Sequence, residues 1–113
     1  MDCIFCKIVA GEIPSEKVYE DEDLYAFYDI QPAAPAHVLL IPKKHISSMM
    51  DVKEEDKGLM GNLILSIQKI AGQLGMDKEG FRVVNNIGEF GQQTVPHIHF
   101  HLIGGRQLTW PPG

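Results

Sequence analysis

The stretch TVPHIHFHLIGG, Thr94–Gly105, determines the expected fold and the expected site of this chain. Every second residue at its centre is a histidine, and the three histidines are His97, His99 and His101. Because successive side chains of a strand point to opposite faces, an extended conformation places all three imidazoles on one face and the intervening apolar residues on the other. A helix, at roughly 100° per residue, would spread the histidines over roughly 200° of arc and form no site. We therefore predict a strand that starts after Pro96.

The remaining sequence predicts the other parts of an α+β fold. The expected elements are one or two helical turns, a hairpin, a strand, a long helix and a further strand, in the order Ile4–Ala10, Lys17–Glu20 with Leu24–Asp29, His37–Pro42, Asp51–Leu74 and Phe81–Asn86. Asp51 and Glu54 suit a capping box, and Gly75 suits a helix end. With the histidine strand, these elements predict an antiparallel sheet of about five strands that carries one long helix on one face.

Length and composition indicate one globular domain. A chain of 113 residues can enclose one core but not two, so we expect residues 1–113 to form a single domain. No run of about 18 apolar residues occurs, so no membrane span is expected. The acidic N-terminus lacks the features of a signal peptide, which favours a cytoplasmic location. The net charge of −5 argues against broad binding to nucleic acid or to membrane surfaces, but it permits a small anionic ligand in a local pocket.

Three histidines on one face admit three interpretations. Two imidazoles spaced His-x-His on a strand can bind zinc, which for catalysis needs a third ligand and an open position. Alternatively, a neutral imidazole can attack phosphorus and form a labile phosphohistidine, while its neighbours supply protons and hydrogen-bond donors. The third interpretation is a histidine-rich edge that only packs or binds metal adventitiously. The Gly-Gln loop before the strand can direct N–H groups at an anion, and this favours the second interpretation.

The two cysteines, Cys3 and Cys6, are spaced C-x-x-C. In a reducing compartment this spacing suggests metal or redox chemistry rather than a structural disulfide. A cysteine pair with two histidines makes a tetrahedral N/S set for structural zinc. Spacing alone does not identify the histidines, and it leaves redox-active or inert thiols as alternatives.

Motifs along the whole chain resemble those of the histidine triad family. HIHFHLI fits the pattern His-φ-His-φ-His-φ-φ, in which φ is an apolar residue. The segments IFCKI, EIP, AFYDI, IPKKHIS, FRVVNN and GGRQLTWPPG follow in the order of that family. The chain looks most similar to the histidine triad nucleotide-binding proteins, which are nucleoside phosphoramidases, and among them to the zinc-binding type.

The resemblance implies a hydrolase of purine nucleoside phosphoramidates, of the adenosine 5'-phosphoramidate type, that forms a covalent nucleotidyl-histidine at His99. His101 would then hydrogen-bond the phosphate oxygens, and His37 would support the triad as a further donor. A dinucleoside polyphosphate hydrolase is an alternative within the same chemistry, although the WPPG ending argues against it. Two alternatives of other classes are a nucleotide- or protein-binding module with vestigial hydrolysis and a catalytic zinc hydrolase that uses the triad as ligands.

The resemblance also implies substrate-binding residues and a homodimer. Asp29 would accept hydrogen bonds from the ribose, with Ile30 against the base, although Asp29 can instead cap the strand end. The residues implied around the phosphate and leaving group are Asn86, Gln93 and Thr94, of which Asn86 can instead close a turn. Trp110 lies in a tail that in this branch reaches the partner subunit's site, and packing on its own subunit is the alternative.

The zinc ligands that the resemblance implies are Cys3, Cys6, His45 and His97. Four protein ligands leave no open position, so the implied zinc is structural and ties the N-terminus to the sheet. The chain departs from the family pattern at Gln92, where glycine is usual. A side chain at that position can narrow the phosphate cradle, or Gly91 can take over the turn. Gln92 therefore bears on the preference for leaving groups.

Overall fold

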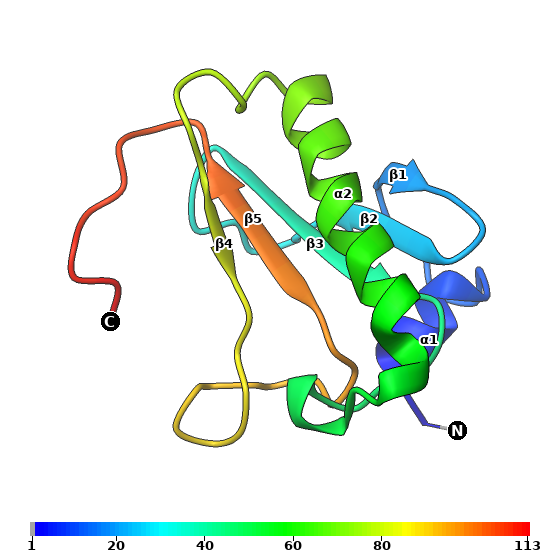
Figure 1. Cartoon of the computed structure of the whole chain (residues 1–113). Coiled ribbons are helices and arrows are strands. Elements are labelled where there is room, and N and C mark those ends of the chain that lie inside the picture. The colour runs from blue at the N-terminus through cyan, green and yellow to red at the C-terminus, as the bar shows by residue number, and fades with distance from the viewer. Residues whose placement is uncertain (1) are drawn as a thin grey trace.

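The computed structural model describes residues 2–113 and has the predicted α+β architecture (Figure 1). Five strands form one sheet in the order β1-β2-β3-β5-β4, and every neighbouring pair is antiparallel. The strands are β1 (Lys17–Glu20), β2 (Leu24–Tyr28), β3 (Ala36–Pro42), β4 (Arg82–Val84) and β5 (Phe100–Gly104). The two strands that carry His37 and His101, β3 and β5, pair directly inside the sheet. The predicted fold class is confirmed.

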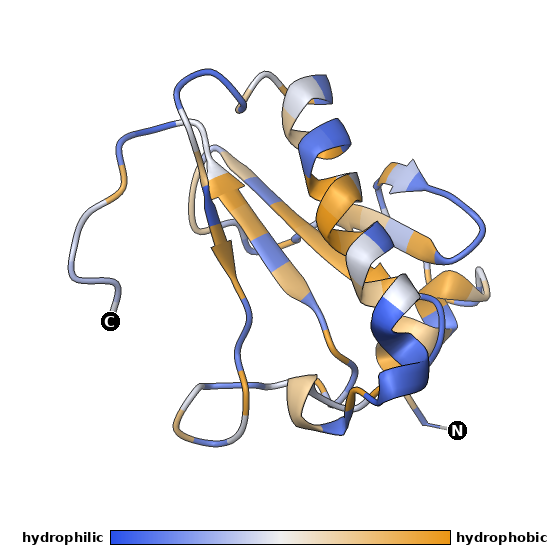
Figure 2. Cartoon of the chain, viewed as in Figure 1, coloured by the Kyte–Doolittle hydropathy of each residue, from blue (hydrophilic) through white to orange (hydrophobic). Residues whose placement is uncertain are grey.

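The long helix α2 (Lys57–Gln73) lies across one face of the sheet (Figure 1). Its buried residues include Leu63, Ile67 and Ile70, which recur at helical spacing and pack in one cluster with apolar side chains of β3 and β5. Figure 2 shows the same apolar character along the central strands beneath the helix. The helix contains three glycines, each of which lowers helix stability by roughly 1 kcal/mol relative to alanine, so packing on the sheet holds it in place.

The helix begins at Lys57 rather than at Asp51. Two short 3-10 helices precede it, and these are η1 (Met49–Asp51) and η2 (Glu54–Asp56). The predicted capping box of Asp51 and Glu54 is therefore wrong. The buried Asp56 instead accepts a hydrogen bond from the Lys53 N–H at 3.0 Å and pairs with Lys44 at 2.6 Å. A buried carboxylate needs such partners, and these contacts set the start of the regular helix.

The opposite face of the sheet is covered by the short helix α1 (Ile4–Val9). Phe5 and Ile8 are buried there against β2 and β3, and the ring centroids of Phe5 and Phe27 lie 5.7 Å apart. Strand β3 is consequently buried on both faces, which explains its continuous apolar run. His45 contacts Cys6 and His99 packs against Phe5, both of α1, so these histidines lie on this face.

The predicted histidine strand is too long at its start. Regular pairing in β5 begins at Phe100, so His97 and His99 precede the strand. The alternation nevertheless holds, because Ile98 and Phe100 pack under α2 while the histidine rings lie on the face of α1. The other predicted strand, Phe81–Asn86, shrinks to β4, since pairing with β5 stops at Val84.

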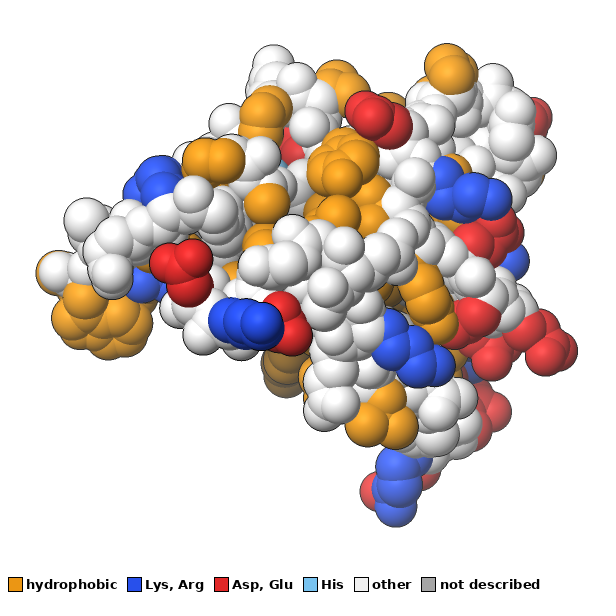
Figure 3. Space-filling view, turned by 90° about the horizontal axis from the view of Figure 1, so that it is seen from above, with side chains coloured by type: hydrophobic (Ala, Val, Ile, Leu, Met, Phe, Trp, Pro, Cys, Tyr) orange, Lys and Arg blue, Asp and Glu red, His pale blue; other side chains and the backbone are white. Residues whose placement is uncertain are grey.

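The surface agrees with the composition. On the face seen from above, basic side chains lie among acidic and apolar ones rather than in one continuous area (Figure 3). Among residues 2–113, the helices lack the length and apolar character that crossing a membrane requires.

Candidate functional site

The backbone of residues 97–99 is held by single hydrogen bonds from separate parts of the chain. The Ile98 N–H donates to the Ile46 carbonyl at 2.7 Å. The side-chain amide of Asn85 donates to the His99 carbonyl at 2.8 Å. The position of the histidines is therefore fixed by the connection after β3 and by the end of β4, in addition to β5 itself.

Among residues 2–113, one ring nitrogen of His99 hydrogen-bonds to the backbone and the other has no hydrogen-bond partner. Its ring is 5% exposed, and its Nδ1 lies 2.8 Å from the His97 carbonyl oxygen. A carbonyl only accepts hydrogen bonds, so the proton of neutral His99 is on Nδ1 and Nε2 keeps a lone pair. The edge of Phe5 packs against this ring at 5.1 Å between centroids, and the His101 ring lies at 5.2 Å. His99 can thus act as a nucleophile or as a metal ligand through Nε2.

His101 has the opposite tautomer, and a main-chain amide determines it. The Ala33 N–H donates to Nδ1 of His37 at 3.0 Å, so neutral His37 carries its proton on Nε2. This Nε2 lies 2.9 Å from Nδ1 of His101 and donates to it. The proton of neutral His101 is consequently on Nε2. Burial, with smaller contributions from His99 and His37, lowers the pKa of His101 to about 4, so this residue is a neutral donor near pH 7.

Asp29 directly follows β2 and lies beside this histidine pair. Its Oδ1 accepts from the Gln31 N–H at 2.8 Å, which is the capping role considered for it, and its Oδ2 lies 3.5 Å from Nε2 of His37. The next residue, Ile30, is 95% exposed.

Asp29, His37 and His101 bring three ligand atoms within 4.8 Å of one another. Two histidines and a carboxylate can bind a metal ion. However, the Ala33 N–H keeps the His37 proton on Nε2, which is the nitrogen that faces the other two residues. A metal would have to displace that proton and break the bond to His101, so the geometry fits proton handling better than metal binding.

Cys3, Cys6, His45 and His97 form a second cluster, in which the four ligand atoms also lie within 4.8 Å of one another. Nδ1 of His97 lies 3.3 Å from Sγ of Cys3 and 3.5 Å from Sγ of Cys6, and Nδ1 of His45 lies 3.3 Å from Sγ of Cys6. Nε2–H of His97 donates to the Pro42 carbonyl at 2.8 Å, so its bare Nδ1 faces the sulfurs. Two sulfurs, two imidazoles and an outer carbonyl suit tetrahedral zinc.

Burial disfavours charge in the second cluster when no metal is bound. Burial, followed by a hydrogen bond with Cys3, raises the pKa of Cys6 to about 11, and burial lowers the pKa of His97. A divalent cation stabilises thiolates and neutral imidazoles, so it would reverse the preference of the cysteines. Metal binding at this cluster would therefore release protons.

The loop between β4 and the triad carries the other predicted site residues. The Asn86 amide donates to the Gly91 carbonyl at 2.6 Å, which is the turn-closing role considered for it. The Gln93 amide donates to the carbonyls of Ser47 at 2.7 Å and Val95 at 3.0 Å, while Thr94 is exposed. Within residues 2–113, the side chains of these predicted site residues hydrogen-bond to main-chain carbonyls or to nothing, rather than to a triad ring.

The same loop explains how Gln92 is accommodated. Gln92 has φ 63°, in the left-handed region that favours glycine. Gly91 is needed for a different reason, because a Cβ there would collide with the main chain of Ile87. The turn thus takes its close approach from Gly91 and its left-handed residue from Gln92.

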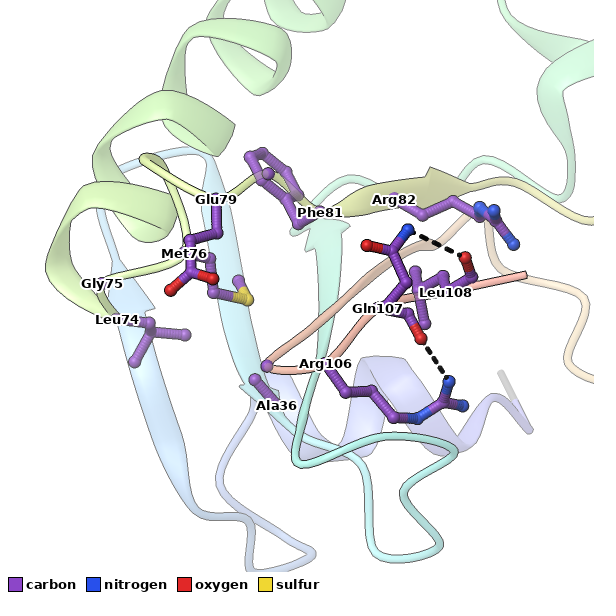
Figure 4. Close-up of a pocket in the computed structure, with 12 residues that line it drawn as sticks. Ala36, Leu74, Gly75, Met76, Glu79, Phe81, Arg82, Arg106, Gln107 and Leu108 are labelled. Atoms are coloured by element: carbon purple, nitrogen blue, oxygen red, sulfur yellow. Dashed lines mark hydrogen bonds between the residues drawn. The ribbon is translucent and has the colours of Figure 1, made fainter. Parts of the chain in front are cut away.

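The C-terminal tail contacts Arg82 of β4. The Arg82 guanidinium donates to the Thr109 carbonyl at 2.8 Å and lies 5.9 Å from the centroid of the Trp110 ring, which is still 79% exposed. A cavity of about 520 Å³ separates the tail from the α2–β4 connection. Figure 4 shows Arg82, Arg106 and Met76 among its lining residues, and none of the histidines lines it.

Sequence reasoning missed the groups that orient the histidines. These groups are the Ala33 N–H, the carbonyls of Pro42 and His97, and the Asn85 side chain. Every residue carries main-chain groups, so the sequence offers no signal for the first three. Asn85 did offer one, since it is a polar side chain at the end of an apolar strand.

Comparison with known proteins agrees with the predicted family and fold. The sequence is 49% identical over 114 residues to the 14 kDa zinc-binding protein of Brassica juncea, with 99% of this chain and 100% of that protein covered. The structure is similar to that of a HIT family hydrolase from Legionella pneumophila Philadelphia 1, with a TM-score of 0.97 and 50% identity over 99% of this chain and 100% of the other.

The histidine triad nucleotide-binding protein from Candida albicans is also similar, with a TM-score of 0.83 and 36% identity over 99% of this chain and 85% of the other. Residues 10–108 match the HIT domain, a span that includes the whole sheet, α2 and all three triad histidines. By sequence and by fold, this chain belongs to the HIT, or histidine triad, family.

Proposed function

We propose that the protein hydrolyses purine nucleoside phosphoramidates, of the adenosine 5'-phosphoramidate type, with His99 as the nucleophile. The observation that carries this proposal is the buried His99 ring, whose Nδ1–H donates to a carbonyl while Nε2 is bare. Imidazole attacks through its lone pair, and a carbonyl on the opposite nitrogen stabilises the positive charge that the ring acquires. The names of the Legionella hydrolase and the Candida nucleotide-binding protein agree with this class of reaction.

In the proposed reaction, a bond forms between Nε2 of His99 and the α-phosphorus, and the P–N bond breaks with its electron pair leaving on the amine. The amine takes up one proton from the pair His37–His101. An anionic phosphate beside these rings favours their protonated form, so the proton is acquired when substrate binds. Water then attacks phosphorus, and the bond between phosphorus and Nε2 of His99 breaks with its electron pair returning to Nε2. The nucleoside monophosphate leaves, and one proton of the water returns to the pair. Nε2–H of His101 donates to the phosphoryl oxygens in both steps.

Asp29 and Ile30 are proposed to bind the nucleoside. The carboxylate of Asp29 would accept from the ribose hydroxyls, and the exposed Ile30 would pack against the base. Asn86, Gln93 and Thr94 are proposed to surround the phosphate and the leaving group. Their loop is tied to the connection after β3 by the Gln93 amide, so it is held at a fixed distance from the triad.

Cys3, Cys6, His45 and His97 are proposed to bind one structural zinc ion. Their chemistry supports this, because two thiols and two imidazoles converge and the tautomer of His97 turns a bare nitrogen toward the sulfurs. The name of the Brassica relative agrees. With four protein ligands the zinc would hold α1 against the sheet, and it would take no part in the chemical step.

A homodimer is proposed as the working form. Strand β4 lies at an edge of the sheet, and it presents Val83, which is 42% exposed. An open edge strand offers unpaired N–H and C=O groups to another chain. Light scattering should give twice the chain mass for the wild type. Val83→Lys should lower this measured mass, and the control Leu65→Lys, on the exposed side of α2, should leave it unchanged. A monomeric wild-type protein would contradict the proposal.

The catalytic proposal is tested by turnover of adenosine 5'-phosphoramidate with the wild-type protein and with His99→Ala. We expect release of AMP by the wild type and at least about a 1,000-fold loss in the variant. Equal rates would refute the role of His99. A diadenosine polyphosphate in the same assay separates the two substrate classes through the ratio of kcat/KM values, and tight AMP binding without turnover of either substrate would indicate a binding module.

A further inference from the structure

Asn85 lies beside His99, at the point where the pairing of β4 with β5 ends. Strand β4 pairs with β5 as far as Val84 opposite His101, and regular pairing stops there. In a continued antiparallel ladder, a main-chain N–H of the neighbouring strand would donate to the carbonyls of β5. Beyond Val84 the side-chain amide of Asn85 takes this role, since its Nδ2 donates to the His99 carbonyl at 2.8 Å.

If His99 is the nucleophile, there is a functional reason for the strand pairing to end beside it. A phosphoryl group needs space beside the ring, so the backbone at His99 lies at the end of the sheet rather than within it. A residue at the end of a sheet loses ladder partners and gains freedom to move. Asn85 restores one fixed contact at this residue while its own main chain turns away into the loop.

The Asn85 contact complements the one on the ring. Nδ1–H of His99 donates to the His97 carbonyl, and this bond orients the imidazole relative to the backbone. The bond from Asn85 anchors the backbone itself relative to β4. Both bonds are needed for Nε2 to keep one position, because a ring that is fixed to a moving backbone still moves.

The oxygen of the Asn85 amide indicates that this residue does not serve to stabilise the folded state. Its Oδ1 is buried and lacks a hydrogen-bond partner among residues 2–113. A buried acceptor without a partner destabilises the folded state, and an apolar residue of similar shape would avoid this penalty. The neighbouring Asn86 differs, because its amide only closes the loop by donating to Gly91.

We propose that Asn85 is a positioning residue that holds the main chain of His99 so that Nε2 meets the phosphorus in line. This proposal rests on the proposed function of His99. Asn85 does not touch the reacting atoms, and its effect therefore falls on the rate of covalent bond formation rather than on nucleotide affinity.

The test compares Asn85→Leu, which keeps the size but removes both amide atoms, with Asn85→Asp, which keeps the shape but replaces the donor with an acceptor. Asn62→Leu on the exposed side of α2 is the matched control. Rapid-quench single-turnover reactions with saturating adenosine 5'-phosphoramidate give the rate of adduct formation, and titration with AMP gives the affinity. Thermal unfolding reports the stability of each variant.

We expect adduct formation to slow at least tenfold in both Asn85 variants, with AMP affinity within threefold of wild type. The unfolding temperature of Asn85→Leu should not fall in proportion to its loss of rate. Adduct rates within threefold of wild type in either folded variant would overturn the proposal. A loss of rate that only follows a loss of folded protein would also overturn it, and Asn85→Asp supplies the comparison if Asn85→Leu fails to fold. A wild-type protein that forms no adduct would instead refute the role of His99.

Discussion

His97 and His99 lie two residues apart on one face of the same segment, yet they present opposite nitrogens. His97 donates from Nε2 to the Pro42 carbonyl and turns its bare Nδ1 to two sulfurs. His99 donates from Nδ1 to the His97 carbonyl and leaves Nε2 bare. The carbonyl that each ring meets therefore decides its chemistry. One ring becomes suited to metal and the other to phosphorus, although the strand pattern treats them alike.

The largest expected effect separates the two rings by activity. His99→Ala should lose at least about 1,000-fold in phosphoramidase turnover and still bind one zinc ion, because its nitrogen is not among the clustered metal ligands. Steady-state kinetics and metal analysis of the same sample check this. If zinc disappeared with His99, the division of roles between the two histidines would be wrong.

The reciprocal change removes the two cysteines that face the His97 ring. Cys3→Ser with Cys6→Ser should abolish zinc binding and lower the free energy of unfolding by at least about 3 kcal/mol, because the proposed zinc would tie α1 to the sheet. Denaturant unfolding with and without a chelator measures this change. The folded fraction of the double variant should still form the His99 adduct, and loss of the adduct from fully folded protein would indicate a catalytic zinc instead.

A smaller effect concerns acid stability. The pKa of His101 is lowered from 6.5 to about 4, so between these values the unfolded chain binds a proton that the folded protein excludes. This contribution to stability is complete above pH 6.5 and is lost as the pH falls toward 4. We expect wild type to lose on the order of 2 kcal/mol more than His101→Gln across this window. Identical pH profiles from denaturant unfolding would refute the assignment.

The smallest effects are expected in the loop that leads to the triad. Gln92→Gly should stabilise the protein by about 0.5 kcal/mol, since relief of the left-handed strain outweighs the added chain entropy. Gly91→Ala should destabilise it by more than about 1 kcal/mol, because the new Cβ meets the Ile87 backbone. Thermal unfolding of both variants tests this pair, and a stabilising Gly91→Ala would contradict the described turn.

Periodicity alone predicted the parts of the fold that depend on which side of an element is apolar. The alternation around His99 gave the two faces of the segment, and the spacing of Leu63, Ile67 and Ile70 gave the helix face. Contacts between distant parts of the chain were not predictable in this way. The helix start depends on the pairing of Asp56 with Lys44, and strand β5 shortens because β4 turns away after Val84.

The candidate site also has a part that was predictable from the sequence and a part that was not. Residue types and the family resemblance identified the residues of both clusters, and the structure brings the four proposed zinc ligands together from three separate parts of the chain. The tautomers were beyond sequence reasoning, because the Ala33 N–H and the Pro42 carbonyl act through atoms that every residue has. Asn85 was missed because its partner is also a main-chain carbonyl.

The most direct test of the central claim is intact-mass analysis after rapid acid-free quench with adenosine 5'-phosphoramidate, followed by digestion to locate the modified residue. The account predicts a transient mass increase of one adenylyl group, located on His99 and absent from His99→Ala. The account would be contradicted by an adenylyl group on another residue. It would also be contradicted if the wild type turned over the substrate while no adduct was detected, either in the first turnover or at steady state.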